Sequence, residues 1–155
     1  ELLIDSLGPK VIYISLDPPE PIKNDENSPV TVEVTIGLDE EVDPSSTPEL
    51  QWVLSGQGRT AQSVQGLTKT TPTSGFAEVY EGTFTLPADG GLAEIETISF
   101  TWSAQDALQN QSNVITASQD FQVYQGELPV IPKNRISNVR QAEIAMRRAM
   151  QSAVF

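Results

Sequence analysis

The sequence predicts an all-β protein in which two layers of antiparallel strands enclose one core, with a short helix appended at the C-terminus. Residues 80–86 and 98–104 alternate apolar and polar side chains, and this period of two is typical of strands with one buried face. About seven such short segments are separated by turn residues, which is typical of a β-sandwich. No segment of helical period occurs before residue 134, so a fold of alternating strands and helices is disfavoured.

The strands follow in chain order from their side chains. Residues 11–16 are mainly β-branched or aromatic, and the prolines at 18, 19 and 21 end this strand because proline cannot sit in a central strand. Residues 30–38 give the clearest alternation. Further strands are expected at 50–54, at 63–69 as a weak edge, at 77–86, at 94–105 and at 114–124. Trp52 and Trp102 are in phase with the apolar residues of their strands, so both indoles are expected in the core.

The chain divides into an N-terminal segment 1–9, a sandwich 10–126, a proline-containing linker 127–137 and an amphipathic basic helix 138–155. The helix is predicted from a change of period, because apolar residues recur there at helical spacing and Asn138 can cap the start. The apolar stripe consists of Val139, Ala142, Met146, Ala149, Met150 and Ala153. Since exposed apolar stripes are usually interfaces, we expect this stripe to bind a protein partner or a neighbouring domain. The alternative is that the helix folds back on its own acidic sheet.

Charge is distributed unevenly along the chain. Residues 1–130 hold 20 acidic and four basic residues, a formal charge of −16, whereas residues 131–155 hold one acidic and five basic residues, a charge of +4. A body this acidic repels phosphates, so no nucleic-acid partner is expected. No stretch approaches the roughly 20 apolar residues of a membrane-spanning helix, so no membrane span is expected. The chain starts at Glu1, and we expect a processed protein or an excised fragment.

The chain contains no histidine and no cysteine. Ser-His-Asp and Cys-His catalysis, disulfides and thiolate metal sites are therefore excluded. The lysines lie in no recognisable motif. Acid–base chemistry by a carboxylate pair, such as Glu94 and Glu96 on one strand, would need one member to be buried, and the proline-bounded acidic run 39–43 is expected to be a solvated loop. The sequence therefore predicts a protein that is not an enzyme and needs no cofactor.

One family resemblance rests on the order of residues in the second half of the sandwich. The runs Tyr80-x-Gly-x-Phe-x-Leu-Pro and Ile98-x-Phe-x-Trp-x-Ala-x-Asp, followed by Asn110-x-Ser-Asn and Phe121-x-Val, resemble a bacterial immunoglobulin-like module. The resemblance covers about residues 10–125. It implies an immunoglobulin-like sandwich of about seven strands in a surface or secreted protein, where such modules serve as spacers, adhesins or accessory domains. The sequence departs from the pattern at Gln109, where glycine is usual, and in lacking the cysteine pair of antibody domains.

Calcium is a candidate ligand because it takes six to eight oxygen ligands, mostly from carboxylates and carbonyls. Asp39, Glu40, Glu41 and Asp43 in one acidic loop could supply several of them, and Asp106 and Asn110 could supply others. The spacing of an EF-hand loop is absent from the sequence, and a proline-bounded run of acids is more often a solvated loop. Calcium therefore stays a minor hypothesis.

The function expected from these observations is a non-catalytic structural or adhesive module of a larger extracellular or cell-surface assembly, with the C-terminal helix as its docking element. One alternative is a carbohydrate-binding accessory module, which needs exposed aromatic residues; Tyr13 and Tyr124 are the two that could face outward, although edge packing is the commoner role. Another alternative is a virion or filament subunit, which needs interfaces that the basic helix and acidic body could provide.

Overall fold

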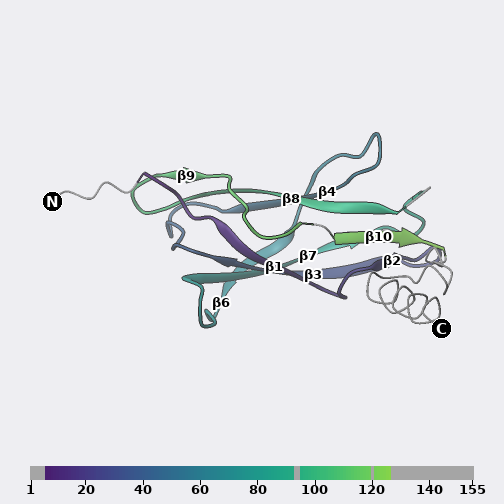
Figure 1. The fold of residues 1–155 in the computed structure, drawn as a ribbon, viewed down its shortest axis with the longest axis horizontal. Coiled ribbons are helices and arrows are strands. Elements are labelled where there is room, and N and C mark those ends of the chain that lie inside the picture. The colour runs from purple at the N-terminus through teal and green to yellow at the C-terminus, as the bar shows by residue number, and fades with distance from the viewer. Residues whose placement is uncertain (1–5, 93–94, 120, 127–155) are drawn as a thin grey trace, which may run out of the picture.

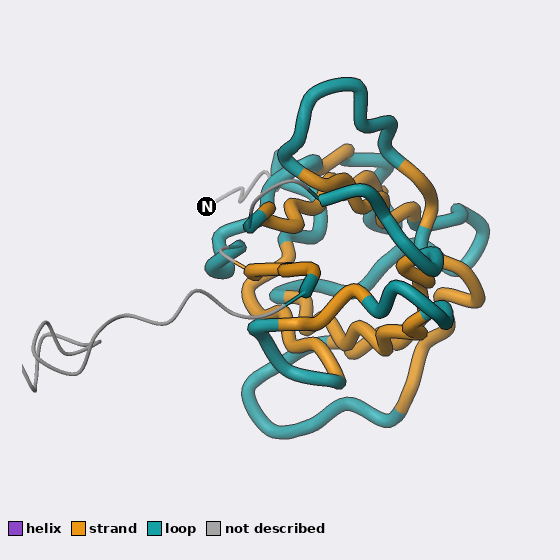
Figure 2. Tube along the Cα trace, turned by 90° about the vertical axis from the view of Figure 1, so that its right-hand side faces the viewer, coloured by secondary structure: helices purple, strands orange, loops and turns teal. Residues whose placement is uncertain are grey.

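A computed structural model describes residues 6–92, 95–119 and 121–126 of the chain. These residues form an all-β structure of ten strands in two sheets (Figure 1). Viewed along the long axis of the molecule, the strands form an upper and a lower layer (Figure 2). The prediction of an all-β fold with two layers is confirmed.

The first sheet contains four antiparallel strands in the order β1-β3-β7-β6. Its centre is the pairing of the two nine-residue strands β3 and β7, which runs without interruption from Val30 opposite Leu86 to Leu38 opposite Glu78. β6 is an edge strand, as predicted. The bounds are β1 Val11–Asp17, β3 Val30–Leu38, β6 Gln65–Thr70 and β7 Glu78–Leu86.

The second sheet has the order β2-β10-β8-β4-β5, with β9 paired to β8. All its pairings are antiparallel except that of β2 with β10, which is parallel. The bounds are β2 Ile22–Asn24, β4 Glu49–Leu54, β5 Gln62–Ser63, β8 Glu96–Gln105, β9 Gln111–Ser112 and β10 Phe121–Gln125.

Aromatic side chains join the two sheets. Phe84 of β7 stacks on Trp52 of β4 with ring centroids 4.6 Å apart, and it meets Phe100 of β8 edge to face at 6.0 Å. Trp52 is 5% exposed and Trp102 is 1% exposed, which confirms the predicted burial of both indoles. Because large aromatics contribute most to core burial, these contacts hold the layers face to face without a disulfide.

The predicted last strand at 114–124 is wrong in its first half. The Val11 N–H donates to Val114 O (3.0 Å) and the Thr116 N–H donates to Val11 O (2.8 Å), so this segment first pairs with the first sheet. The side-chain oxygen of Gln119 then accepts from the Phe100 N–H (2.7 Å), which occupies a ladder donor of β8. Regular pairing to β8 therefore begins only at Phe121.

Three strands have no counterpart in the sequence prediction: β2, β5 and β9. Each has only two or three residues, which is too short for an alternation to show. The linker 127–137, the helix 138–155 and its apolar stripe lie outside the described residues, as do residues 1–5 of the N-terminal segment. Among the described residues, no helix is long and apolar enough to cross a membrane.

Candidate functional site

Loops from both sheets meet at each end of the sandwich. At the end where residues 6–10 enter, the Asp43 N–H donates to Gln105 O (2.8 Å), which joins loops 39–48 and 106–110. At the opposite end, Asn24 bonds to Pro87 and Gly90, which brings β2 against loop 87–92. The last described residues, up to Gly126, leave the sandwich at this second end (Figure 1).

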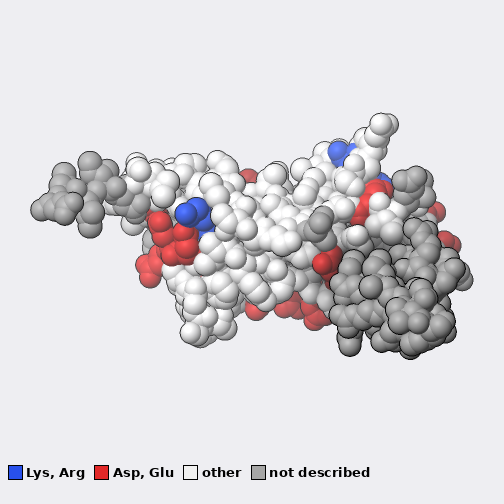
Figure 3. Space-filling model, viewed as in Figure 1, with Lys and Arg blue, Asp and Glu red and all other residues white. Residues whose placement is uncertain are grey.

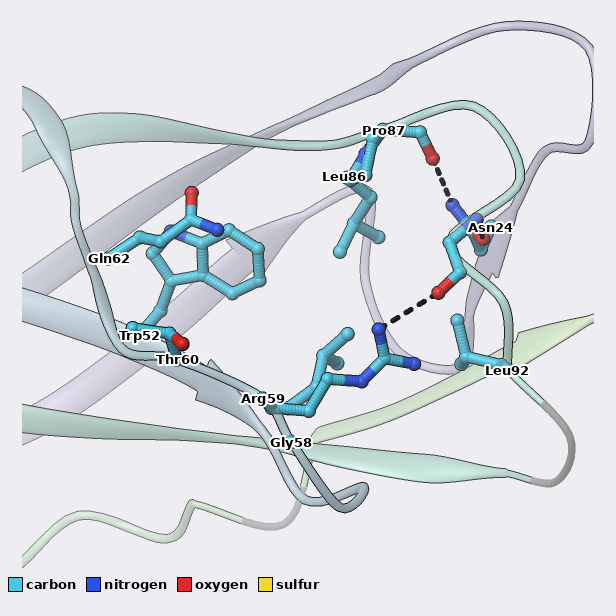
Figure 4. Close-up of a pocket in the computed structure, with 11 residues that line it drawn as sticks. Asn24, Trp52, Gly58, Arg59, Thr60, Gln62, Leu86, Pro87 and Leu92 are labelled. Carbon is cyan, nitrogen blue, oxygen red and sulfur yellow. Dashed lines mark hydrogen bonds between the residues drawn. The ribbon is translucent and has the colours of Figure 1, made fainter.

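A pocket of about 270 Å³ opens at the second end, between the two sheets (Figure 4). Its apolar wall consists of Trp52 and Leu54 from β4, Leu86 from β7 and Leu92. Polar side chains, two glycines and a proline line the rest of the pocket, so one side is apolar and the other can form hydrogen bonds. The lining comprises Asn24, Trp52, Leu54, Gly58, Arg59, Thr60, Gln62, Leu86, Pro87, Gly90 and Leu92.

Arg59 closes one side of the pocket through three hydrogen bonds. Its Nε and Nη2 donate to the two carboxylate oxygens of Glu96 (3.1 and 2.6 Å), and its Nη1 donates to Gly90 O (2.9 Å). Figure 4 shows the guanidinium between the β4–β5 loop and loop 87–92. This bidentate geometry is the strong form of a charged hydrogen bond. It ties loop 55–61 to the start of β8.

Glu96 is only 8% exposed, so it is a buried carboxylate. Burial alone would raise the pKa of Glu96, but hydrogen bonds from Arg59 and from the Gly56 N–H (2.6 Å) outweigh it and lower the pKa. Gly56 permits this close approach, because a Cβ there would lie 2.5 Å from Glu96 Oε1. The hydrogen bonds between Arg59 and Glu96 raise the pKa of Arg59 in turn.

Asn24 fixes the other side of the pocket. It is fully buried, donates through Nδ2 to Pro87 O (2.8 Å) and accepts from the Gly90 N–H through Oδ1 (2.6 Å). A Cβ at Gly90 would lie 2.6 Å from that same oxygen, so only glycine allows the contact without a shift. A buried amide with both ends bonded holds β2 and loop 87–92 at a set distance.

The lining of this pocket favours binding over proton transfer. Its one ionisable side chain is Arg59, and that group is held by Glu96. General acid–base chemistry needs a group that can gain or lose a proton near neutral pH, which arginine does not do. The pocket can therefore offer shape, apolar contact and hydrogen bonds.

The other end holds the calcium candidates, and the structure brings their two groups together. Asp43 and Asp106 lie in adjacent loops, yet their carboxylates bond within their own turns, Asp43 to Ser45 and Asp106 to the N–H groups of Leu108 and Asn110. Burial opposes the ionised form of Asp106, but the bonds from Asn110 and Leu108 lower its pKa. Asp39 pairs with Lys10 at 3.6 Å. In the described ranges, no group of three or more histidine, cysteine, aspartate or glutamate side chains is placed to hold a metal ion. Calcium binding stays a prediction.

A buried carboxylate anchors the acidic loop. Glu78 is 4% exposed and accepts hydrogen bonds from the Val42 N–H (3.1 Å), the Tyr80 hydroxyl (3.0 Å) and Lys69 Nζ (3.3 Å). Burial raises the pKa of Tyr80 well above its usual range, and the nearby Glu78 carboxylate adds to the shift. Because these bonds join Glu78 of β7 to loop 39–48 through Val42 and to β6 through Lys69, Glu78 has a structural role.

The aromatic residues considered for carbohydrate binding do not form a row. Tyr13 is 42% exposed on β1 and its ring packs against Phe76 at 5.2 Å, whereas Tyr124 is only half-buried on β10 of the other sheet. A platform for a sugar chain needs several exposed rings on one face, and these two tyrosines lie on different sheets with only Tyr13 exposed. Tyr13 therefore faces outward, and its contact with Phe76 agrees with the edge-packing role that the sequence favoured.

Sequence reasoning did not find the pocket residues Asn24, Arg59 and Gln62. One signal was present, since Arg59 is one of only four basic residues among 1–130 and lies in a glycine-containing loop between two strands. Its partner Glu96 is 37 residues away, and the pairing depends on how the loops fold over the sheet ends.

Comparisons with known proteins add no name to this site. Neither the scan against protein-family models nor the search of curated proteins gives a match to the chain.

Proposed function

We propose that the chain is an immunoglobulin-like module with a non-catalytic structural or adhesive role in a larger extracellular or cell-surface assembly. The observation that carries this proposal is the strand order. In the immunoglobulin fold, strands A, B, E and D form one sheet and C, F and G form the other. The orders β1-β3-β7-β6 and β10-β8-β4 fit A-B-E-D and G-F-C. Trp52 on β4 then takes the place of the buried tryptophan of strand C.

The path of the chain supports a role as a connecting module. Lys10 enters beside Asp39 at one end, while Gln125 leaves beside Asp89 and Leu92 at the other, with its side chain bonded to both. Figure 1 shows these two ends far apart along the long axis. A sandwich with this path can transmit force or set a distance between the segments on either side of it. A non-enzymatic role is further supported by the missing histidine and cysteine.

Docking through the C-terminal segment is the second part of the proposal. Residues 131–155 carry a charge of +4 against −16 in the rest of the chain. In Figure 3 acidic side chains outnumber basic ones on the visible face of the sandwich. Attraction between opposite charges would bring the basic segment to a second copy or to a neighbouring domain, and the apolar stripe from Val139 to Ala153 would then supply the contact area.

Deleting residues 134–155 should leave a folded sandwich that no longer assembles, because every strand of the described structure precedes the deletion. The measurement is solution mass by light scattering, with circular dichroism as the check on folding. Changing Arg140, Arg147 and Arg148 to glutamine in the full chain is the matched control, since it keeps the apolar stripe and removes charge.

The proposal expects this arginine variant to assemble more weakly and with less dependence on salt, since screening acts on the charged contacts. If the truncated chain unfolds or binds a hydrophobic dye, the C-terminal segment belongs to the sandwich core and the docking proposal fails. If the full-length chain stays monomeric at high concentration, the C-terminal segment does not dock on a second copy of the chain. Binding of the full-length or the truncated chain to a glycan array would instead favour the carbohydrate-binding alternative.

A further inference from the structure

We propose that the pocket between β4, β7 and loop 87–92 binds a small uncharged molecule that combines an apolar ring or branched chain with a carbonyl oxygen. Every lining residue lies between Asn24 and Leu92 in the sequence, and the inference does not depend on the proposed function. Three properties of the pocket carry the inference: its size, its unused hydrogen-bond donors and its balance of charge.

Size limits the ligand to a fragment. The pocket encloses about 270 Å³, just below the roughly 300–1,000 Å³ typical of pockets for drug-sized molecules. Trp52, Leu54 and Leu86 form a wall of buried residues, so the wall is backed by the core and cannot collapse inward without disturbing it. A single ring or a branched chain with one substituent fits this space.

Unused donors set the polar group of the ligand. The indole N–H of Trp52 has no hydrogen-bond partner among the described residues, and an indole can only donate. Because every fully buried side-chain nitrogen or oxygen in the described ranges has a partner, this N–H is accessible from solvent and is not enclosed in the core. Arg59 uses three of its N–H groups and has five. Gln62 and Thr60 at the rim also lack side-chain partners in the part of the chain that the structure describes, but each can donate or accept, so the donor-only groups Trp52 and Arg59 decide the balance. Figure 4 shows Trp52, Gln62 and Arg59 around the same opening. A surplus of donors calls for an acceptor.

Charge decides between a neutral acceptor and an anion. The positive charge of Arg59 is balanced by Glu96 at 2.6 Å, so it offers hydrogen bonds rather than a free charge. Asp25 and Asp89 lie in the neighbouring loops, which are joined by the Asp89 N–H bond to Asp25 O (3.0 Å). A carboxylate entering the pocket would meet this negative field in a chain of net charge −12. A carbonyl oxygen satisfies the donors without that repulsion.

The test uses the two tryptophans of the full chain as reporters. Trp52 lines the pocket, whereas the indole N–H of Trp102 donates to Pro9 O (2.9 Å) at the other end of the sandwich. In ¹⁵N-labelled protein their indole signals are followed during titration with phenylacetamide, phenylacetate and phenethylamine. All three probes contain a phenyl ring on a short chain. Phenylacetamide is neutral and has a carbonyl acceptor, phenylacetate is an anion, and phenethylamine is a cation without an acceptor.

We expect phenylacetamide to shift the Trp52 signal saturably with a Kd of about 1 mM or tighter, as befits about ten heavy atoms. The Trp102 signal should not move, and both charged probes should bind at least about fivefold more weakly because one meets repulsion and the other leaves the donors unpaired. Equal shifts with all three probes, equal shifts of both indoles, or no shift of Trp52 up to 10 mM would each overturn the proposal.

A pair of variants separates the pocket from the surface. Thr60→Phe places a ring at the rim and should weaken phenylacetamide binding by about tenfold. Thr73→Phe makes the same change in an exposed turn at the other end and should bind the probe like the natural chain. Because both threonines are exposed, both variants are expected to fold. Equal loss of binding in the two variants, or none in Thr60→Phe, contradicts the proposed site.

Discussion

Replacing Trp102 by alanine should destabilise the sandwich by about 3–5 kcal/mol, the usual cost of removing a large aromatic from a core. Trp102 is 1% exposed and lies on β8 opposite Leu50 of β4. Its indole N–H also donates to Pro9 O (2.9 Å), so the change both leaves a cavity and removes the side-chain donor that holds the entering segment at that carbonyl. The free energy of unfolding, measured by urea denaturation with tryptophan fluorescence and circular dichroism, gives the answer.

Two further variants separate the packing of Trp102 from its hydrogen bond. Trp102→Phe keeps most of the apolar surface but leaves the Pro9 carbonyl without this donor, which should cost about 1–3 kcal/mol. Leu108→Ala removes an apolar side chain that is 68% exposed and should change stability by less than about 0.5 kcal/mol. A loss below about 1 kcal/mol in Trp102→Ala would mean that the inward face assigned to β8 is wrong.

The strands that could be predicted are those that bury one face along most of their length. β3 buries Val32, Val34 and Ile36 at every second position, so the alternation in the sequence shows which face of the strand points to the core. β3 pairs with β7 along its whole length. The segment 114–119 could not be predicted in the same way, because its hydrogen-bond partners depend on where the chain runs in the fold and not on its own side chains. Val11 of the first sheet bonds to Val114 and Thr116 before the chain reaches β8. Apolar residues at 114 and 115 look like a strand start although they form only a single bridge.

The pocket could not be predicted from the sequence because each of its contacts spans a long distance in the chain. Asn24 reads as a turn residue, yet it is buried by Pro87 and Gly90, which are more than 60 residues away. Glu96 lies at a strand end, and nothing in the sequence identifies Arg59, 37 residues away, as its partner. Polar residues at strand ends have the same pattern whether they face water or a neighbouring loop, so only the folded arrangement distinguishes the two.

Replacing Arg59 by alanine should destabilise the sandwich by about 2 kcal/mol at pH 7, because it leaves the carboxylate of Glu96 without its cationic partner. Removing one partner of a fully buried ion pair costs about 3–5 kcal/mol. The side chains of Arg59 and Glu96 are 27% and 10% exposed, so water offsets part of that cost. The measurement is the free energy of unfolding of both chains in urea, and Lys10→Ala is a matched control, because the Lys10–Asp39 pair is longer and more exposed and should contribute well under 1 kcal/mol.

The difference between the natural chain and Arg59→Ala should shrink as the pH falls. The pKa of Glu96 is lowered in the folded state, so the stability that the pair contributes is fully present above the unfolded pKa of about 4.3 and is lost as the pH falls through the folded value. In Arg59→Ala the carboxylate keeps its burial and loses its partner, so protonation relieves the variant while it weakens the natural chain. Unfolding measured at pH 7 and at pH 3 should therefore give a large and a small difference. A difference that stays constant with pH would assign the cost to the lost packing of Arg59 and its bond to Gly90 O (2.9 Å), and not to the ion pair.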